Sequence, residues 1–247
     1  MKEQVYLWCQ QAIELINQQT SFSVDTKAAA DDLVTDVDRL LESKFKQWIS
    51  EAYPDHQMVG EEYGLLGESS DHLWIIDPID GTVNFVKQGK DFGILISYYY
   101  QRKPVLAAIV DVTRRDIFMA IVGEGVFKNK KPLKPLQNFS LKESLVSIDT
   151  GFASHYPMFQ KINEVSFKTR YIGACSMDSL AVIEGRFGVY ISYRGKLWDY
   201  AAPYVFAKVM NLGIFSVDGK EFDPFTAEDM ILCNPGATQD LKELLYE

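Results

Sequence analysis

The sequence predicts a mixed fold in which an α+β first part is followed by an α/β second part. Three observations lead to this prediction: two early segments of helical periodicity, three consecutive β-rich runs, and helix and strand patterns that alternate toward the C-terminus. Such alternation is typical of α/β architecture. The 247 residues allow one large domain or two small ones. We place the boundary between two halves near residue 135, which gives segments 1–135 and 136–247.

Two amphipathic helices are predicted first. From about Glu3 to Gln18, apolar residues recur on one helical face. Residues 21–31 are small and polar and predict a loop. A second apolar stripe runs from Val37 to Ile49, ends before Pro54, and has acidic residues in its first turn, where the helix dipole favours negative charge.

Strands dominate the remainder of the first half. Residues 57–60 predict a short strand, and the apolar run that begins at Leu73 predicts a buried strand that breaks at Asp77-Pro78 and again at Asp80-Gly81. Three β-rich runs separated by short polar turns then predict an antiparallel meander: Phe92–Tyr100, Val105–Val112 and Ile117–Val122.

The second half alternates. We expect strands at Leu145–Ile148, Phe187–Ser192, Ile214–Val217 and Met230–Cys233, and helices at Met158–Glu164, Ser179–Glu184, Asp199–Asn211 and from Thr238 onward. Pro203 would be tolerated in the first turn of its helix. Asp199 would start that helix, where an isolated aspartate is typical of an N-cap.

The bulk composition excludes several classes of protein. Hydrophobic residues make up 47% and charged residues 24% of the chain, and no apolar run is long enough to span a membrane. The polar N-terminus does not resemble a secretory signal, and three scattered cysteines predict reduced thiols in a cytoplasmic protein. The net charge of −9 argues against broad nucleic-acid binding.

Asp77 and Asp80 leave the end of the predicted buried strand three residues apart. Burying both as bare anions would be very unfavourable, so a cation is expected between them. A hard divalent metal is the simplest candidate, and bound metal would also reconcile an acidic protein with an anionic substrate.

The segment from Trp74 to Phe85 resembles the central motif of the inositol monophosphatase family, W-x-x-D-P-[IL]-D-G-T-x-N-F. Three further motifs of these Mg2+-dependent, lithium-sensitive phosphomonoesterases occur in the family's order. They are Asp32–Asp38 for D-x-V-T-x-x-D, Val59–Glu62 for G-E-E, and Trp198–Ala202 for W-D-x-A. The resemblance spans the chain from about Lys27. It implies a layered αβαβα sandwich of the inositol monophosphatase/fructose-1,6-bisphosphatase type, with the active site between the halves, and a homodimer.

The resemblance also implies the metal ligands. Glu61, Asp77 and the backbone carbonyl of Ile79 would hold one Mg2+, and Asp77, Asp80 and Asp199 a second, with Asp77 as the bridge. A third, weaker ion is expected near Glu61, which makes two to three ions per site. An all-oxygen ligand set suits Mg2+ and differs from a typical zinc site.

The resemblance implies that water is the nucleophile. Thr82 and Asp38 would orient and deprotonate it, with Glu61 sharing this work. The backbone amides of Gly81 and Thr82 would bind phosphate oxygens. The expected substrate-binding residues are Asp80, Gly81, Thr82, Gly173, Ala174, Cys175, Ser192, Arg194 and Asp199.

The sequence departs from the family pattern on the substrate side. Family members often carry a glutamate seven residues before the helix-start aspartate, where this chain has Ser192. Arg194 and Lys196 could accept a second phosphate, or they could be surface cations. Lys27 and Arg170 could support the metal site or a subunit contact.

The substrate class is therefore left open. The first hypothesis is a phosphatase of a small phosphorylated polyol or sugar such as inositol 1-phosphate. The alternatives are a 3′(2′)-nucleotide, NADP or fructose 1,6-bisphosphate phosphatase. A different class is a non-catalytic RNA- or transcription-associated binding protein, which the acidic charge and the retained carboxylates argue against. We expect no membrane partner.

Overall fold

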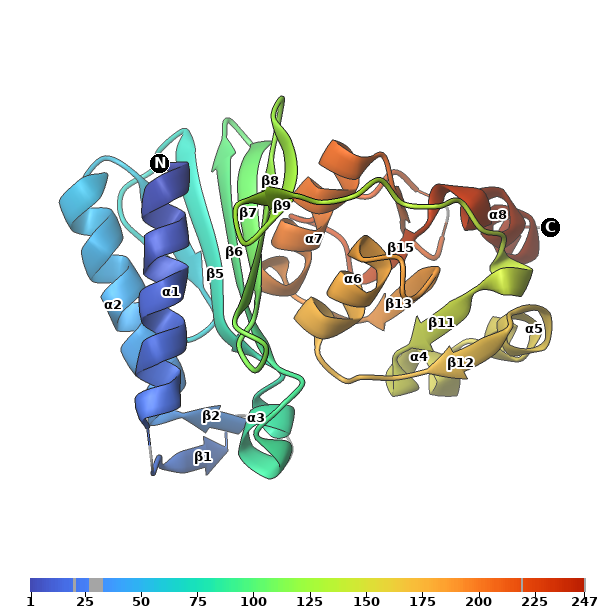
Figure 1. Cartoon of the computed structure of the whole chain (residues 1–247), viewed down its shortest axis with the longest axis horizontal. Coiled ribbons are helices and arrows are strands. Elements are labelled where there is room, and N and C mark those ends of the chain that lie inside the picture. Colours follow the sequence, from blue (N-terminus) through green and yellow to red (C-terminus); the bar gives the residue numbers. More distant parts are fainter. Residues whose placement is uncertain (20, 27–32, 219, 247) are drawn as a thin grey trace.

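The computed structural model describes residues 1–19, 21–26, 33–218 and 220–246, and it forms five layers (Figure 1). Helices α1 (Lys2–Gln18) and α2 (Asp36–Ala52) cover one face of the larger sheet. Helices α6 (Cys175–Ile183) and α7 (Leu197–Met210) lie between the two sheets. The outer face of the smaller sheet carries helices α4 (Thr150–His155), α5 (Met158–Val165) and α8 (Thr238–Tyr246). The predicted αβαβα sandwich is therefore confirmed.

The larger sheet has eight strands in the order β10-β9-β8-β7-β6-β5-β3-β4. All neighbours pair antiparallel except β3 and β5. The predicted meander is present as β6, β7 and β8. The strand bounds are β3 Gln57–Gly60, β4 Gly64–Leu66, β5 His72–Asp80, β6 Gly93–Tyr100, β7 Lys103–Asp111, β8 Asp116–Ile121, β9 Gly125–Lys128 and β10 Lys131–Pro132.

The smaller sheet has five strands in the order β12-β11-β13-β15-β14, and β11 runs parallel to both of its neighbours. The carboxyl ends of β11, β12 and β13 therefore share one edge, the usual position of ligand sites in α/β sheets. The bounds are β11 Leu145–Ile148, β12 Lys168–Arg170, β13 Val189–Tyr193, β14 Gly213–Phe215 and β15 Asp229–Cys233. The larger sheet ends at Pro132 and the smaller one begins at Leu145, while the division into halves at residue 135 stays a prediction.

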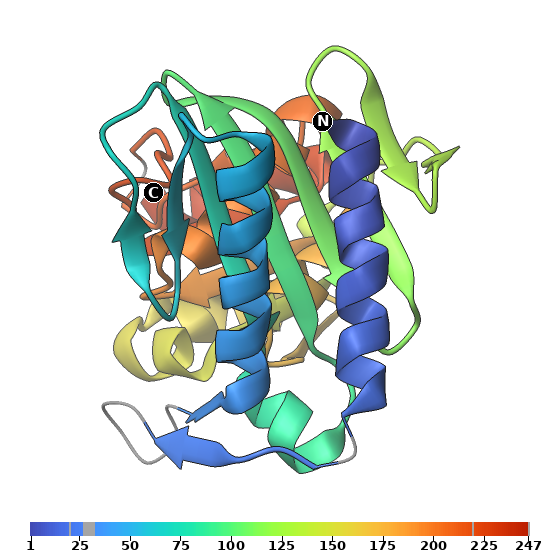
Figure 2. The ribbon, with the colours of Figure 1, turned by 90° about the vertical axis from the view of Figure 1, so that its left-hand side faces the viewer.

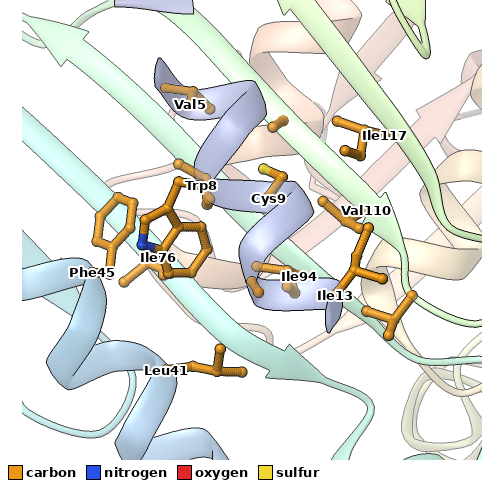
Figure 3. Packing of buried hydrophobic residues seen from close by; sticks show 14 of the residues in the cluster. Val5, Trp8, Cys9, Ile13, Leu41, Phe45, Ile76, Ile94, Val110 and Ile117 are labelled. Carbon is orange, nitrogen blue, oxygen red and sulfur yellow. The ribbon is translucent and has the colours of Figure 1, made fainter. Parts of the chain in front are cut away.

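Helices α1 and α2 lie side by side on the larger sheet (Figure 2). Figure 3 shows their apolar faces meeting the sheet, with residues of α1, α2, β5, β6, β7 and β8 in one cluster. Full burial of a large apolar side chain contributes roughly 1.5–3 kcal/mol, so this cluster fixes β5, which carries two of the predicted ligands. Its labelled members are Val5, Trp8, Cys9, Ile13, Leu41, Phe45, Ile76, Ile94, Val110 and Ile117. None of the described helices is both long and apolar enough to cross a bilayer.

Several predicted boundaries were wrong. Strand β5 does not break at Asp77-Pro78 but continues to Asp80. Its register with β6 shifts between Asp77 and Asp80, so Pro78, which has no N–H, lies where the ladder is irregular. The stretch predicted as a loop contains strand β1 (Val24–Thr26), which pairs with β2 (Leu33–Thr35), while residues 27–32 lie outside the described residues. Short strands and helix α4 had no clear periodicity in the sequence.

Two helices begin earlier than predicted. Helix α6 begins at Cys175 instead of Ser179. The sequence did not reveal its first turn, because the helix is buried on all sides and shows no amphipathic stripe. Helix α7 begins at Leu197, which places Asp199 inside its first turn and Pro203 in its second turn instead of its first. A proline there leaves the carbonyl of Asp199, four residues earlier, without its intrahelical donor.

Candidate active site

Three carboxylates converge where β5 meets the start of α7. Asp77 and Asp80 extend from β5, and Asp199 extends from the first turn of α7. One oxygen of each side chain lies within 4.8 Å of an oxygen of the other two. They come together because α7 packs across β5, β6 and β7 of the larger sheet.

The electrostatics of this cluster call for a cation. Burial raises the pKa of Asp77 well above its usual value, and the neighbouring charges of Glu61 and Asp80 raise it further. The pKa of Asp199 is raised to about 8, first by burial and then by Asp80. Within the described ranges none of the three aspartates forms a salt bridge with Lys or Arg. Two buried aspartates and the half-buried Asp199, none of them in a salt bridge among the described residues, offer a set of carboxylate oxygens that fits a hard divalent cation such as Mg2+.

The turn that follows Asp77 is shaped by the same residue. An oxygen of Asp77 accepts a hydrogen bond of 3.1 Å from the amide of Ile79. The carbonyl oxygen of Ile79 in turn accepts a hydrogen bond of 3.0 Å from the hydroxyl of Thr82. Residues 77–82 therefore form one compact unit that presents carboxylate, carbonyl and hydroxyl oxygens together.

Asp80 is held by the N-terminus of α6, which comes from the other part of the chain. Its oxygens accept hydrogen bonds from the amides of Cys175 (3.2 Å) and Ser176 (2.6 Å), and from the hydroxyl of Ser176. The sequence analysis missed Ser176. Amides at a helix N-terminus have no intrahelical acceptor and carry partial positive charge, so they suit a carboxylate.

Cys175 reaches this site through its backbone, since its side chain is buried. The thiol donates to the carbonyl oxygen of Asp199 at 3.3 Å. This carbonyl is the one that Pro203 leaves without an intrahelical donor. Burial and the nearby aspartates raise the pKa of the thiol well above its usual value, which disfavours the nucleophilic thiolate.

Asp38 and Thr82 are brought together as expected. The hydroxyl of Thr82 lies 3.5 Å from an oxygen of Asp38. The other oxygen of Asp38 accepts hydrogen bonds from the amide (2.9 Å) and hydroxyl of Thr35, the N-cap of α2, which leaves one oxygen for Thr82. Burial raises the pKa of Asp38 to about 6. Asp32, in the same motif, lies outside the described residues.

Glu61 lies in the turn between β3 and β4, close enough to Asp77 to raise its pKa. A second carboxylate, Glu42 of α2, is completely buried below this turn. Glu42 accepts hydrogen bonds from the amides of Glu62 (2.8 Å) and Tyr63 (3.0 Å). Sequence analysis missed Glu42, although an acidic residue one helical turn after Asp38 on a buried helix face was an available signal.

The turn at Gly81 touches the loop before α6. Gly81 has a φ of 84°, and a Cβ added there would lie 2.7 Å from the Cβ of Ala174. Gly173 also has a positive φ, of 89°. The side chain of Asn84 donates to the carbonyl of Ile172 at 3.1 Å. The predicted phosphate-binding turn and the predicted substrate loop are therefore in direct contact.

The remaining predicted substrate residues lie along the edge where β13 ends. The hydroxyl of buried Ser192 accepts a hydrogen bond from the hydroxyl of Tyr200 (3.2 Å). Arg194 is exposed, has a φ of 53°, and places its guanidinium over the ring of Tyr193. The amide of Lys196 donates to Asp199 at 2.6 Å.

Two further cations, Arg170 and Lys27, were predicted to support the metal site or a subunit contact. Arg170 is exposed and donates to the backbone carbonyl of its neighbour Thr169. Lys27 lies outside the described residues.

A cluster of carboxylate oxygens inside an αβαβα sandwich is the arrangement of a metal-dependent enzyme. The sequence profile of the Inositol monophosphatase family matches residues 1–247. The chain belongs to this family.

Family membership and the phosphatases among its relatives make the chain a phosphoric monoester hydrolase. The inositol-1-monophosphatase of Bacillus subtilis is 28% identical over 253 residues, which cover 96% of this chain and 92% of that protein. The fructose-1,6-bisphosphatase/inositol-1-monophosphatase of Aquifex aeolicus is 29% identical over 211 residues, which cover 82% of this chain and 78% of that protein. The Nus factor SuhB of Pseudomonas aeruginosa is 33% identical over 73% of this chain and 70% of its own length.

Solved structures are closely similar. A staphylococcal IMPase-I complexed with products superimposes with a TM-score of 0.92 at 33% identity, covering 99% of this chain and 94% of that one. An IMPase/NADP phosphatase complexed with Mg2+ and phosphate has a TM-score of 0.90 at 32% identity, with the same coverage. Another structure of an IMPase/NADP phosphatase contains NADP and Ca2+ and has a TM-score of 0.92.

Proposed function

We propose that this protein is a Mg2+-dependent phosphatase that hydrolyses a small phosphorylated polyol or sugar such as inositol 1-phosphate. The observation that carries the proposal is the convergence of oxygens of Asp77, Asp80 and Asp199 within 4.8 Å, with no salt bridge to any of the three among the described residues. The nearby pair of Asp38 and Thr82 adds groups suited to orienting water.

We assign two to three Mg2+ ions to this site. Asp77 would bridge two of them, with Glu61 and the Ile79 carbonyl completing one set and Asp80 with Asp199 completing the other. Bound Mg2+ would lower the pKa of water and offset the charge that develops on the phosphoryl and leaving oxygens. The oxygen-only donor set supports Mg2+ over zinc.

The side chains of Asp38 and Thr82 would orient the attacking water. Asp38 is fixed by the N-cap Thr35, so its free oxygen can accept a hydrogen bond from the Thr82 hydroxyl when the single hydrogen of that hydroxyl turns away from the Ile79 carbonyl. The Thr82 oxygen can then accept a hydrogen bond from water, which would direct a lone pair of the water oxygen toward phosphorus. Glu61 would assist at the edge of the cluster.

The substrate phosphate would lie at the start of α3 (Thr82–Gln88). The amides of Gly81 and Thr82 belong to the first turn, whose N–H groups have no intrahelical acceptor. Gly81 has no side chain that would obstruct contact between a phosphate oxygen and these amides. The remainder of the substrate would extend past Gly173 and Ala174 toward Ser192 and Arg194.

A second candidate is a substrate with two phosphate groups, such as fructose 1,6-bisphosphate, NADP or a 3′-phosphoadenosine nucleotide. The observation in its favour is Arg194, an exposed guanidinium two residues after Ser192 at the edge where β13 ends. The similarity to a dual IMPase/NADP phosphatase and to a bifunctional bisphosphatase adds weight. Arg binds phosphate in a bidentate manner.

We further propose a cytoplasmic homodimer that lithium inhibits. The three cysteines are buried and free, which suits a reducing compartment. The similarity to a staphylococcal enzyme whose structure was obtained after a lithium chloride soak supports the lithium proposal. Sedimentation analysis would test the dimer, and inhibition of phosphate release by LiCl would test the sensitivity.

The test of the main proposal is a phosphate-release screen with Mg2+ on inositol 1-phosphate, fructose 1,6-bisphosphate, 3′-phosphoadenosine 5′-phosphate and NADP. Asp77→Asn is the matched control and should be nearly inactive while remaining folded. Hydrolysis of none of the four by the wild type, together with RNA binding, would favour the non-catalytic alternative suggested by similarity to a Nus factor.

A further inference from the structure

Asp178 of α6 is a buried carboxylate that belongs to none of the groups assigned above. Its side chain is completely inaccessible to solvent, and no described Lys or Arg forms a salt bridge with it. One oxygen accepts hydrogen bonds from the hydroxyl of Ser147 (2.5 Å) and the amide of Ile172 (3.3 Å). The other oxygen accepts a hydrogen bond from the amide of Gly173 (3.1 Å).

A charge without an ionic partner is unfavourable in the protein interior, so the Asp178 carboxylate depends on these hydrogen bonds for its stabilisation. Two of the three donors are consecutive backbone amides of the segment that enters α6. Asp178 therefore ties this segment back onto the helix that it precedes, much as a capping residue does. The third donor, Ser147 of β11, ties the same carboxylate to the smaller sheet.

The opposite side of the segment faces the proposed active site. The carbonyl of Ile172 accepts from Asn84 of α3, and Ala174 lies against Gly81. The next two amides, of Cys175 and Ser176, bind the carboxylate of Asp80. Residues 172–176 thus lie between Asp178 on one side and the strand end with its metal ligands on the other.

We propose that Asp178 is a positioning residue that fixes the segment 172–174, so that the N-terminus of α6 holds Asp80 in the orientation required for metal binding. It acts through the backbone and does not itself contact substrate or metal. The inference deepens the proposed function, since it rests on Asp80 as a metal ligand. Loss of such supporting hydrogen bonds typically reduces metal affinity or activity by 10–100-fold.

The test compares Asp178→Asn with Ser147→Ala. Asparagine has nearly the same shape but only one acceptor oxygen, so at least one backbone amide would face another donor. Alanine at position 147 removes only the hydroxyl donor and leaves both amide bonds in place. Asp178→Asn should raise the Mg2+ concentration for half-maximal activity about tenfold or more, whereas Ser147→Ala should change it less than about threefold.

A second readout requires no catalysis. Amide hydrogen exchange of residues 171–177 in metal-free protein should be about tenfold faster or more in Asp178→Asn and little changed in Ser147→Ala. If the wild type shows no Mg2+-dependent hydrolysis, the proposed function fails, and the exchange result still decides whether Asp178 holds this segment.

Folded Asp178→Asn with wild-type exchange and wild-type Mg2+ dependence would overturn the proposal. If this variant does not fold, the smaller Asp178→Ser is measured in the same way. Failure of both variants to fold would also overturn it, because the carboxylate would then be a requirement for folding and not for positioning.

Discussion

Glu42 occupies the space that any side chain at position 60 would need. A Cβ added to Gly60 would lie 2.0 Å from the Oε1 of Glu42. The same carboxylate accepts the amides of Glu62 and Tyr63, so the turn that carries Glu61 closes around it. The glycine of the G-E-E motif is therefore explained by close approach to a buried carboxylate.

Gly60→Ala should displace Glu42 and weaken both hydrogen bonds to the turn. We expect a loss of about 1–3 kcal/mol in the free energy of unfolding, as for other cases of overpacking, and a higher Mg2+ requirement because Glu61 moves. Urea denaturation and Mg2+ titration of activity would measure these effects. In a Glu42→Ala background the added methyl group has room, so the penalty should shrink. Equal penalties in both backgrounds would exclude the steric explanation.

Thr82→Ala should lower kcat by about 100-fold or more, because the hydroxyl between Asp38 and the Ile79 carbonyl is lost. Thr82→Ser keeps the hydroxyl, and its kcat should stay within about tenfold of the wild-type value. Calorimetric titration should show nearly unchanged Mg2+ binding in both variants. A wild-type kcat in Thr82→Ala would remove this residue from the mechanism.

Asp199→Asn should lose nearly all phosphate release and yet stabilise the metal-free protein at pH 8. The pKa of Asp199 in the folded state is about 8 against 3.8 for the unconstrained residue, so the folded state binds its proton more tightly. Stability contributed by this group is present at acidic pH and falls as the pH rises from about 4 to about 8. Asparagine carries no charge and avoids this loss.

The measurement is thermal unfolding in EDTA across that pH range. We expect Asp199→Asn to exceed the wild type at pH 8 by at least about 1 kcal/mol, or about 2–4 °C in Tm for a protein of this size. The two curves should converge toward pH 4. At saturating Mg2+ the wild type should instead be more stable than Asp199→Asn, because Mg2+ would bind the folded state through Asp199. A wild type that is less stable at pH 5 than at pH 8 without metal would contradict the assigned direction.

Arg194→Ala should lower kcat/KM for fructose 1,6-bisphosphate or NADP by about tenfold, and for inositol 1-phosphate by less than about twofold. Arg194→Lys keeps the charge but loses the bidentate geometry, so its kcat/KM for the doubly phosphorylated substrates should lie between those of the wild type and Arg194→Ala. Steady-state kinetics on the three substrates would measure this. Equal effects on all substrates would reject a second-phosphate contact.

The similarity of the motifs made part of this site predictable. Asp77 and Asp80 could be assigned because a buried apolar run ended in two carboxylates, a strictly local pattern. Helices α1 and α2 were predictable because each has one buried face. Strands β6, β7 and β8 were predictable as β-rich runs between polar turns, although both of their faces are buried. Helix α6 was placed too late because it is buried on every side and has no periodic signal at its start.

The amino-acid sequence alone determined the two helices on the larger sheet and the meander, because periodicity and turn chemistry act between near neighbours in the chain, and the similarity of the motifs identified their acidic residues. Only the tertiary structure decided that the first amides of α6 bind Asp80, 95 and 96 residues away, and that Glu42 and Asp178 lie beneath the loops around the cluster. The pairings of Asp80 and Asp178 depend on how α6 packs between the two sheets, and the pairing of Glu42 depends on how α2 lies against the turn after β3. Buried hydrogen bonds between distant segments leave no local pattern in the sequence.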